Sequence, residues 1–600
     1  MTSLTDYIDY QNLSSLHHLF LTRVKKNPND IAYQQYNHGT SKWDNTSWSE
    51  MTLLIAKWSN KMKQEGLTKG DRIAIMLPNC KEWVICDQAA YNLGLIVVPL
   101  YINDRAENTG YIIKDTEVKL IVFKSEEQWL IINEAMKDLS SIKRFISIDT
   151  ITGIQNDRYT NLASWIDESS DVLPEPVDID QNSLATIVYT SGTTGKPKGV
   201  MLSHKNILWN AYACSATEDF CPDDTFLSFL PLSHMFERTV GYYLPILCGA
   251  KVAFARSIEQ LGEDLQTIKP TLLVTVPRIF ERVNNKIQLG LSQKSKVASF
   301  LFNQAVKVGW QRFLYSQKRT SWKLMLIFWP ILNLLVAGKI TAKLGGNLRL
   351  AVSGGAPLSL DIAKTFIGLG LTISQGYGMT ETSPVICTNK LDDNEPGSVG
   401  QPLIDVEIMF GDKDELLVKS PGVMMGYWNN EEATHQLIDN DNWLHTGDKA
   451  KIVGQHVYIT GRLKEILVLS NGEKVPPSDI ELAISSDPII DQVMLIGEGK
   501  PFLSAVIVLN SELLKPLLNK LGMKESAPSC LTNPKIIKNT LELIQSKLKG
   551  FPGYTEIYSI ILTLDPWTVE AGLITPTLKL KRANIINLFK NEINELYKGH

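Results

Sequence analysis

Hydrophobic and polar positions alternate between two spacings in the first part of the chain. Short runs of apolar and β-branched residues predict buried strands. Longer segments with apolar residues at helical spacing lie between them and predict amphipathic helices. Strands that alternate with helices in this way indicate βαβ units in a mostly parallel sheet. The predicted strands span 71–77, 95–100, 118–123 and 144–148, and the predicted helices span 13–24, 46–66 and 82–93.

The same alternation continues between residues 206 and 374. Three predicted strands, one of them just before residue 206, lead into glycine-bearing turns at 187–200, 353–357 and 375–382. Ligands of open α/β sheets bind at the carboxyl ends of the strands, so these turns together predict one binding crevice. The expected helices span 206–217 and 240–247, and the expected strands span 225–230, 251–254, 272–276, 348–352 and 371–374.

The pattern changes after about residue 400, where short strands and turns predict a small β-rich lobe. A further change follows Gly461. A Pro-Pro pair at 476–477 precedes a capping box over 478–481, which indicates a helix start. Two apolar runs on either side of a Gly-Glu-Gly-Lys-Pro turn then predict a hairpin. The strands of the lobe are expected at 406–410, 415–419, 450–453 and 457–460, and those of the hairpin at 492–496 and 503–509.

The length of 600 residues exceeds what one hydrophobic core usually supports. The predicted fold class is therefore α/β, with a large N-terminal region over 1–461 and a separate, smaller, mobile α+β domain over 462–600. The N-terminal region contains mostly parallel α/β layers to about residue 400 and the β-rich lobe at 401–461. The hinge between the two is expected near 462–464.

Composition and charge add little to this picture. The hydrophobic fraction of 44% and the charged fraction of 21% are ordinary for a soluble globular protein, and a net charge of −4 favours no class of partner. Seven cysteines without CxxC spacing, mostly among apolar neighbours, indicate reduced core thiols rather than disulfides or zinc ligands. No cationic region of a secretory signal is visible at the N-terminus. A cytoplasmic protein is expected.

The segment IVYTSGTTGKPKGV at 187–200 has the chemistry of a phosphate-gripping loop. Its glycines allow close approach of the backbone to a polyanion, while hydroxyls, amides and lysines supply hydrogen bonds and charge. It is not a Walker A loop, because Pro197 follows Lys196 where that motif needs Ser or Thr. The composition alone also fits a flexible turn with exposed lysines.

Seven motifs in one order resemble the adenylate-forming acyl-CoA synthetase superfamily over residues 15–590. They are YTSGTTGKPKGV at 189–200, LPLSHMFER at 230–238, SGGAPL at 353–358, QGYGMTET at 375–382, WLHTGD at 443–448, GRLKE at 461–465 and TPTLKLKR at 575–582. The last motif and a long insert around 285–345 resemble the long-chain fatty acyl-CoA synthetase branch. This resemblance implies ATP-dependent activation of a long-chain fatty acid to acyl-CoA through acyl-AMP, with release of pyrophosphate and AMP.

The resemblance also assigns roles in nucleotide binding. The glycine loop would grip the β- and γ-phosphates of ATP, Tyr377 would stack on adenine, and Asp448 with Arg462 would contact the ribose. Glu381 would bind Mg²⁺, a hard cation that takes carboxylate and phosphate oxygens together. The expected ATP and AMP ligands are Thr190, Ser191, Gly192, Thr193, Thr194, Lys198, Gly354, Gly355, Ala356, Gln375, Gly376, Tyr377, Gly378, Thr380, Asp448 and Arg462.

The catalytic roles that the resemblance implies fall on Lys579, His234, Thr380 and Glu381. Lys579 would bridge the carboxylate and the α-phosphate and stabilise the charge that develops between them. His234 would orient the carboxylate or gate CoA entry, and an ordinary core histidine is the alternative. Lys464 matches the hinge position. Two residues depart from the usual pattern: Gly461 replaces an Asp and Asp414 replaces a glycine.

Two other functions remain open at this point. A fatty acyl-AMP ligase would deliver its product to a carrier protein, but the compact stretch after Arg462 favours CoA as the acceptor. A catalytically inactive lipid-binding protein at a membrane is the second alternative, and the intact site motifs oppose it.

The insert over 282–343 carries eleven Lys or Arg residues and no Asp or Glu. It includes about fifteen mainly apolar residues between Lys323 and Lys339, fewer than the roughly 20 that span a bilayer. A buried helix that lines the acyl tunnel is one interpretation. Docking to a membrane interface, with Trp322, Phe328 and Trp329 at the headgroups, is the other. The expected location is therefore cytoplasmic with peripheral contact to the inner face of a membrane, and no nucleic-acid partner is expected.

Overall fold

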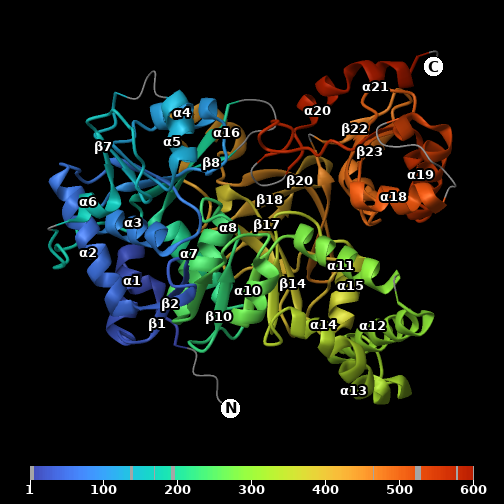
Figure 1. Cartoon of the computed structure of the whole chain (residues 1–600), viewed down its shortest axis with the longest axis horizontal. Helices are drawn as coiled ribbons and strands as arrows, with labels where there is room; N and C mark the ends of the chain where they lie inside the picture. Colours follow the sequence, from blue (N-terminus) through green and yellow to red (C-terminus); the bar gives the residue numbers. More distant parts are fainter. Residues whose placement is uncertain are drawn as a thin grey trace.

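The computed structural model describes residues 6–135, 140–167, 169–190, 196–292, 294–463, 465–520, 529–575 and 579–598. Two large sheets form the N-terminal region, and a smaller orange-to-red part lies beside them at the upper right of Figure 1. The described elements confirm the predicted α/β class.

The first sheet has eight strands in the order β19-β9-β8-β4-β3-β5-β6-β7. The six strands from β8 to β7 in this order pair in parallel. Strand β9 lies between β8 and β19 and runs antiparallel to both. Apolar residues fill its inner strands because helices cover both faces of a parallel sheet. Its strands are β3 (Arg72–Met76), β4 (Ile96–Pro99), β5 (Leu120–Phe123), β6 (Arg144–Ser147), β7 (Tyr159–Asn161), β8 (Leu184–Thr190), β9 (Lys198–Ser203) and β19 (Gly426–Tyr427).

The second sheet has nine strands in the order β16-β15-β14-β13-β12-β10-β11-β1-β2. Strands β14 to β1 pair in parallel, and antiparallel strands close both edges. The strands are β1 (Ile31–Asn37), β2 (Lys42–Ser47), β10 (Thr225–Ser228), β11 (Lys251–Phe254), β12 (Leu272–Thr275), β13 (Leu350–Ser353), β14 (Ile373–Gly378), β15 (Val385–Thr388) and β16 (Gln401–Pro402).

Helices cover both sheets. Capping side chains begin several of them: Ser47 forms a capping box with Glu50 at the start of α2, and Ser15 accepts the His18 amide at the start of α1. The helices are α1 (Leu16–Lys26), α2 (Trp48–Gln64), α3 (Lys81–Asn92), α4 (Ala106–Asp115), α5 (Glu126–Glu134), α6 (Leu162–Ile166), α7 (His204–Ser215), α8 (Met235–Arg238), the π-helix η3 (Thr239–Tyr243), α9 (Leu244–Cys248), α10 (Leu261–Ile268), α11 (Pro277–Ser292), α12 (Lys296–Ser316) and α15 (Leu360–Gly368).

A buried ion pair ties the two sheets together. Arg238 at the end of α8 contacts Asp87 on α3 at 2.5 Å, and both side chains are fully buried. The hydroxyls of Tyr242 and Tyr243 donate to the other Asp87 oxygen at 3.0 and 2.9 Å. A buried pair of this kind is stable only when its remaining polar atoms are satisfied. The network fixes the segment just after His234 against the first sheet.

The β-rich lobe is an antiparallel sheet in the order β17-β18-β20-β21, as predicted for 406–460. Strand β20 is longer than expected and includes the HTGD motif. The lobe contains β17 (Glu407–Phe410), β18 (Glu415–Lys419), β20 (Leu444–Val453), β21 (His456–Arg462) and the helix α16 (Glu431–Leu437).

The C-terminal part has a core of its own. Alternate residues of its central hairpin enter two hydrophobic clusters, with Val493 and Leu495 on one face and Met494 and Ile496 on the other. The predicted hairpin is confirmed as β24 and β25. The elements are β22 (Leu467–Val468), β23 (Lys474–Val475), α17 (Pro477–Ser485), β24 (Ile490–Ile496), β25 (Leu503–Leu509), α18 (Ser511–Lys520), α19 (Pro534–Lys547), β26 (Ile557–Thr563), α20 (Arg582–Leu588) and α21 (Lys590–Leu596).

The predicted capping box over 478–481 is wrong. Helix α17 begins at Pro477, its N-cap is Pro476, and no side chain caps it. Proline is favoured at the first helical position because it has no backbone N–H that would need an acceptor. The helix therefore starts at Pro477 without a cap from Ser478. Glu481 instead forms an ion pair with Arg582 at 2.6 Å and accepts the Leu495 amide at 2.7 Å.

Candidate active site

The two ends of the glycine loop lie opposite each other in one hairpin. Thr190 ends β8, Lys198 begins β9, and these two residues are paired across the antiparallel ladder. The Lys198 Nζ atom lies 5.0 Å from the centre of the Tyr427 ring. The predicted phosphate ligands Ser191, Gly192, Thr193 and Thr194 lie outside the described residues, as does Lys464 of the predicted hinge.

Glu381 is held by a tyrosine from the first sheet. It is buried in the short 3-10 helix η6 (Thr380–Thr382), and its Oε1 atom accepts a hydrogen bond from the Tyr427 hydroxyl at 2.8 Å. Burial and the neighbouring Glu381 raise the pKa of Tyr427, so the phenol keeps its proton and donates. Lys198, Tyr427 and Glu381 thus form one chain of contacts, with Thr380 beside it.

The donor set at Glu381 suits a magnesium ion that is shared with a nucleotide. Mg²⁺ is commonly held by one or two carboxylates, with substrate phosphates and water completing the shell. Glu381 offers one fixed carboxylate, and Thr380 adds a hydroxyl. Within the described ranges, no group of three or more His, Cys, Asp or Glu side chains could form a complete protein cage. The residues present therefore fit Mg²⁺ bound together with phosphate.

The predicted adenine and ribose residues meet across β14, β20 and β21. The Tyr377 hydroxyl donates to Asp448 Oδ2 at 2.6 Å, and Arg462 Nε donates to Asp448 Oδ1 at 2.8 Å. Asp448 and Arg462 are direct partners in the β20–β21 ladder. Burial and the Asp448 carboxylate raise the pKa of Tyr377 well above its usual range. Both oxygens of Asp448 are consequently oriented by neighbours.

The turn after β13 packs directly on the motif that contains His234. A Cβ atom on Gly354 would lie 3.0 Å from the Phe236 ring, and Gly355 has a φ of +80° that favours glycine. On β14, a Cβ on Gly378 would overlap the Pro384 carbonyl oxygen at 2.0 Å. Gly354 and Gly378 thus permit close packing that a side chain would obstruct, and Gly355 permits the turn itself.

The remaining predicted nucleotide ligands lie along the same edge. Ala356 follows Gly355 in the exposed turn, and Gly376 is half-buried on β14. The Gln375 side chain is buried, accepts the Leu358 amide at 3.3 Å and donates to the Pro396 carbonyl. Its amide group therefore braces two loops.

His234 is a buried histidine whose ring accepts a hydrogen bond in the structure. It is the N-cap of α8, and its Nδ1 atom accepts the Phe236 amide at 3.3 Å. Burial and the positive charge of Lys579 lower its pKa to about 4. An imidazole that accepts at Nδ1 and is neutral carries its proton on Nε2, so Nε2–H is available to a carboxylate.

Lys579 comes from the C-terminal part and lies within electrostatic reach of charged residues from both parts of the chain. Desolvation by the surrounding protein and the positive charge of Arg462 lower its pKa, while Asp448, Glu381 and Glu465 oppose that change. The side chain still has surface open to solvent. Its backbone is fixed by Thr575, whose hydroxyl accepts the Lys579 amide at 3.0 Å.

The neighbouring cation Arg582 does not compete for this position. It forms a two-bond ion pair with Glu481 on α17, at 2.8 and 2.6 Å. Two further contacts join the C-terminal part to the N-terminal region: Arg278 donates to the Asp491 carbonyl at 2.7 Å, and Arg105 packs against Gly572. These contacts hold the C-terminal part in the orientation in which Asp448 and Glu381 influence the pKa of Lys579.

Sequence reasoning missed two residues that position the site. Tyr427 holds Glu381, and Glu415 braces the HTGD motif by accepting the Gly447 amide at 2.9 Å and contacting His445 at 3.0 Å. No pattern in the sequence around Tyr427 or Glu415 predicts these roles, because each residue contacts a motif that is distant in sequence.

The two departures from the family pattern have structural consequences. Asp414 has a φ of +61°, which explains why a glycine is usual there. Gly461 has a φ of +146°, a value that disfavours the usual Asp in this arrangement.

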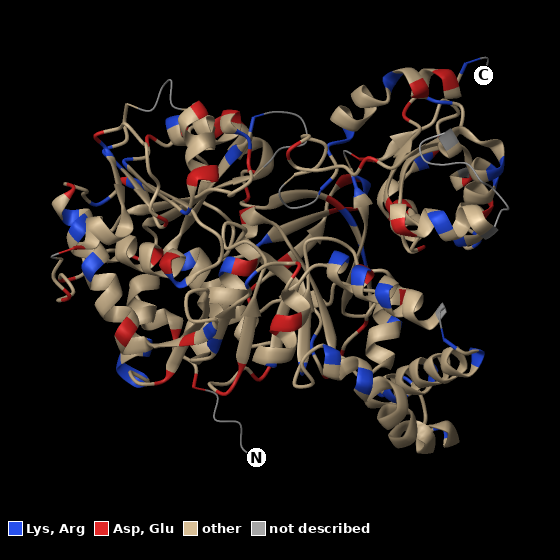
Figure 2. Ribbon diagram, in the orientation of Figure 1, with Lys and Arg blue, Asp and Glu red and all other residues tan. Residues whose placement is uncertain are grey.

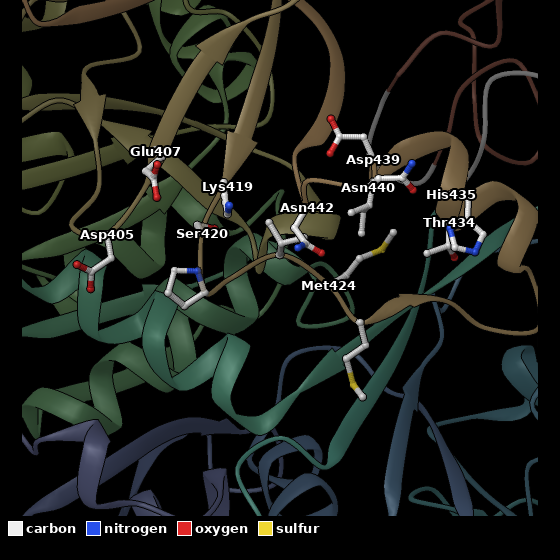
Figure 3. A pocket seen from close by; sticks show the side chains of 14 residues that line it. Asp405, Glu407, Lys419, Ser420, Met424, Thr434, His435, Asp439, Asn440 and Asn442 are labelled. Atoms are coloured by element: carbon white, nitrogen blue, oxygen red, sulfur yellow. The ribbon is translucent and has the colours of Figure 1, made fainter.

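A separate cavity of about 750 Å³ lies on the β-rich lobe (Figure 3). Side chains from β17, β18 and α16 line it, among them Glu407, Lys419 and His435. None of the predicted catalytic or nucleotide-binding residues lines this cavity, and its charges are mixed. The region around Asp448, Glu381 and Lys579 is therefore the candidate active site.

Comparisons with known proteins show the family and the fold of the chain. A model of the AMP-binding enzyme family matches residues 20–428, and a model of an AMP-binding enzyme C-terminal domain matches residues 464–600. The A domain of a carboxylic acid reductase from Segniliparus rugosus, solved with AMP and a co-purified carboxylic acid, has the same fold. Its TM-score is 0.76 at 21% identity, over 99% of this chain and 97% of that one.

Curated relatives cover nearly the whole chain. A long-chain-fatty-acid–CoA ligase of Mycobacterium bovis (FadD15) is 28% identical over 96% of this chain and 95% of that protein. Long-chain-fatty-acid–CoA ligase 5 of Rattus norvegicus is 32% identical over 88% of this chain and 80% of that protein. A chloroplastic long-chain-fatty-acid–acyl-carrier-protein ligase of Arabidopsis thaliana is 28% identical over 92% of this chain and 82% of that protein. The chain belongs to the AMP-binding enzyme family, in its long-chain fatty acyl-CoA synthetase branch.

Proposed function

We propose that the protein activates long-chain fatty acids with ATP and transfers the acyl group to CoA. The observation that carries this proposal is that Lys579 lies within electrostatic reach of the predicted site residues. Arg462, Asp448 and Glu381 influence its pKa, and its positive charge lowers the pKa of His234. A cation, a neutral hydrogen-bond donor and oriented carboxylates from both parts of the chain suit the joining of two anions.

In the first step, a carboxylate oxygen of the fatty acid attacks the α-phosphorus of ATP, and the bond to pyrophosphate breaks. The Lys579 ammonium stands between the two anions and offsets the charge that develops in this in-line transfer. His234 holds the carboxylate through Nε2–H, and Asp448 with Arg462 holds the ribose. Mg²⁺, held by Glu381, would offset charge on the phosphates. The products are acyl-AMP and pyrophosphate.

In the second step, the CoA thiolate attacks the acyl carbon and AMP leaves. We propose that the domain over 462–600 first rotates about a hinge at Lys464 relative to the region over 1–461. The separate core of that domain supports such a rotation, because its hydrophobic clusters contain no residue before 467. Rotation would withdraw Lys579 and open a path for the thiol.

Purified protein with oleate, ATP, Mg²⁺ and CoA is expected to release one pyrophosphate for each acyl-CoA formed. Pyrophosphate and thioester are measured in the same reaction, and omission of Mg²⁺ is the control. A reaction that yields pyrophosphate and loads a carrier protein, but forms no acyl-CoA, would assign the protein to the carrier-protein ligases. Formation of neither product would overturn the proposal in favour of an inactive lipid-binding protein.

As the pH rises, the rate of adenylation is expected to fall with a midpoint below pH 10.5, which is the ordinary pKa of a lysine. Lys579 must carry its proton to offset charge, and its pKa lies below that value because of desolvation and Arg462. The charge is therefore lost as the pH rises through the lowered pKa. The pH profile of pyrophosphate formation measures this limb. Lys579→Arg should move it to higher pH, because guanidinium keeps its proton, and an unmoved limb would contradict the assignment.

We also propose a cytoplasmic location with peripheral contact between residues 282–343 and the inner face of a membrane. Long-chain fatty acids partition into bilayers, so such contact would place the enzyme beside its substrate.

A further inference from the structure

Residues 324–343 form one helical run with two apolar stripes. The run consists of the 3-10 helix η4 (Leu324–Phe328), α13 (Trp329–Leu332), the π-helix η5 (Asn333–Ala337) and α14 (Gly338–Lys343). One stripe packs on α12 and α15, where Leu332 and Ala337 are buried. The run projects with α12 from the lower right of the molecule in Figure 1.

The second stripe is exposed, and no other segment among the described residues covers it. Its side chains recur at helical spacing, and the most exposed are Leu324 at 70% and Leu334 at 74%. Exposed apolar patches of this kind mark interaction sites with proteins or membranes. We call it the outer stripe, and it consists of Leu324, Ile327, Phe328, Ile331, Leu334 and Leu335.

The charges around the outer stripe are of one sign. Residues 282–343 contain eleven Lys or Arg and no Asp or Glu, and the projecting helices in Figure 2 are blue and tan. Arg319 is paired with Asp393 and Glu395, so its charge is already offset. The other cations of residues 312–343 are exposed, and they are Arg312, Lys318, Lys323, Lys339 and Lys343. An anionic surface would complement both the apolar stripe and its basic border.

We propose that the outer stripe is an in-plane anchor that inserts into the interface of an anionic bilayer. This inference deepens the peripheral contact proposed above, and it does not depend on the reaction. An amphipathic helix with a basic border binds an interface through its buried apolar area and its attraction to anionic lipids.

The run lies in the interface and does not cross the bilayer. By length and composition, Leu324–Lys343 could span a membrane, being longer than the fifteen apolar residues expected from the sequence. One face of the run is fixed to α12, so a spanning helix would draw α12 into the bilayer with it. Helix α12 carries Lys296, Lys307 and Arg312, and charged side chains are costly in the hydrocarbon core. Only the outer stripe is free to enter lipid.

Helix α12, on which the run over 324–343 packs, is itself closely packed on α15. Helices α12 and α15 approach so closely that a Cβ on Gly309 would lie 1.8 Å from the Gly368 carbonyl oxygen. Helix α15 leads into β14, which carries Tyr377. The anchor would therefore hold the catalytic region at a constant distance from the membrane surface.

The test is flotation of the full-length protein with phosphatidylcholine vesicles that contain or lack phosphatidylglycerol. We expect the wild-type protein to float with the anionic vesicles and to float less at high salt. The double variant Ile331→Glu and Leu334→Glu should bind about tenfold or more weakly, because it removes two large apolar side chains from burial in lipid. The matched control is Leu130→Glu with Val172→Glu, two side chains that are 60% and 72% exposed elsewhere on the surface.

A second measurement reports insertion directly. Quenching by lipids labelled in the upper acyl chain should reach Trp322, and the quenched fraction should fall in Trp322→Phe. Thermal melting of each variant checks the fold. The proposal is overturned if the wild-type protein does not float, or if the double variant floats as well as the control. A wild-type dimer that the double variant converts to a monomer, without flotation, would assign the stripe to a second copy instead.

Discussion

Replacing Lys579 with alanine is expected to lower the rate of acyl-AMP formation by about 10²- to 10³-fold, the cost of removing one preorganised charge or donor from a transition state. The ammonium is within electrostatic reach of Glu381, Asp448 and Arg462, and the proposed mechanism places it between the carboxylate and the α-phosphate. Stopped assays of pyrophosphate release from oleate and MgATP measure the loss. Binding of ATP should change much less, because the other nucleotide contacts remain.

The second half-reaction separates this role from a general structural one. Lys579→Ala should still form thioester from supplied oleoyl-AMP and CoA at nearly the wild-type rate, because rotation withdraws the lysine before that step. Lys581→Ala, two positions along the same segment, is the matched control and should retain adenylation. Equal loss of both half-reactions in Lys579→Ala would contradict the assignment.

Replacing Glu381 with glutamine is expected to lower adenylation by about 10²-fold or more, because the change removes the charge that would hold Mg²⁺ at the phosphates. Glutamine is close in shape and can still accept the Tyr427 hydroxyl, so the local structure is preserved. The rate of pyrophosphate release as a function of Mg²⁺ concentration is the measurement. The dependence on Mg²⁺ should shift to higher concentrations.

Tyr427→Phe provides the graded companion to this variant. It leaves the Glu381 charge but removes its hydrogen bond, which for a charged acceptor costs about 1.5 kcal/mol, or roughly tenfold. A loss in Tyr427→Phe as large as in Glu381→Gln, with an unchanged Mg²⁺ dependence in both, would mean that Glu381 acts only as a structural partner of the tyrosine.

The buried strands and the amphipathic helices could be predicted because their patterns are local. Strands such as β3 and β5 are continuous apolar runs, and their expected ranges match within a few residues. The hairpin of β1 and β2 was missed because both strands are rich in polar residues, and β2 forms the edge of the sheet. Strand β9 was missed for another reason: it reads as the end of the glycine loop and becomes a strand only through pairing with β8.

The predicted turn over 375–382 was partly wrong for the same physical reason. Strand β14 continues through Tyr377 to Gly378 because β15 pairs with it on the far side. The extension places the Tyr377 hydroxyl against Asp448, a contact between residues 71 positions apart. Edge pairing and register depend on a partner strand, and no local pattern contains that information.

The sequence by itself determined the order of the elements, the chemical character of each motif and the family, because these depend on residue types and short spacings. Only the tertiary structure decided that Tyr427 holds Glu381, that Glu415 braces the HTGD motif and that Lys579 lies within electrostatic reach of Asp448. Those relations join distant segments and, for Lys579, two parts of the chain with separate cores. The exposure of the outer stripe was decided in the same way, because an apolar helix face has the same sequence pattern whether protein or lipid covers it.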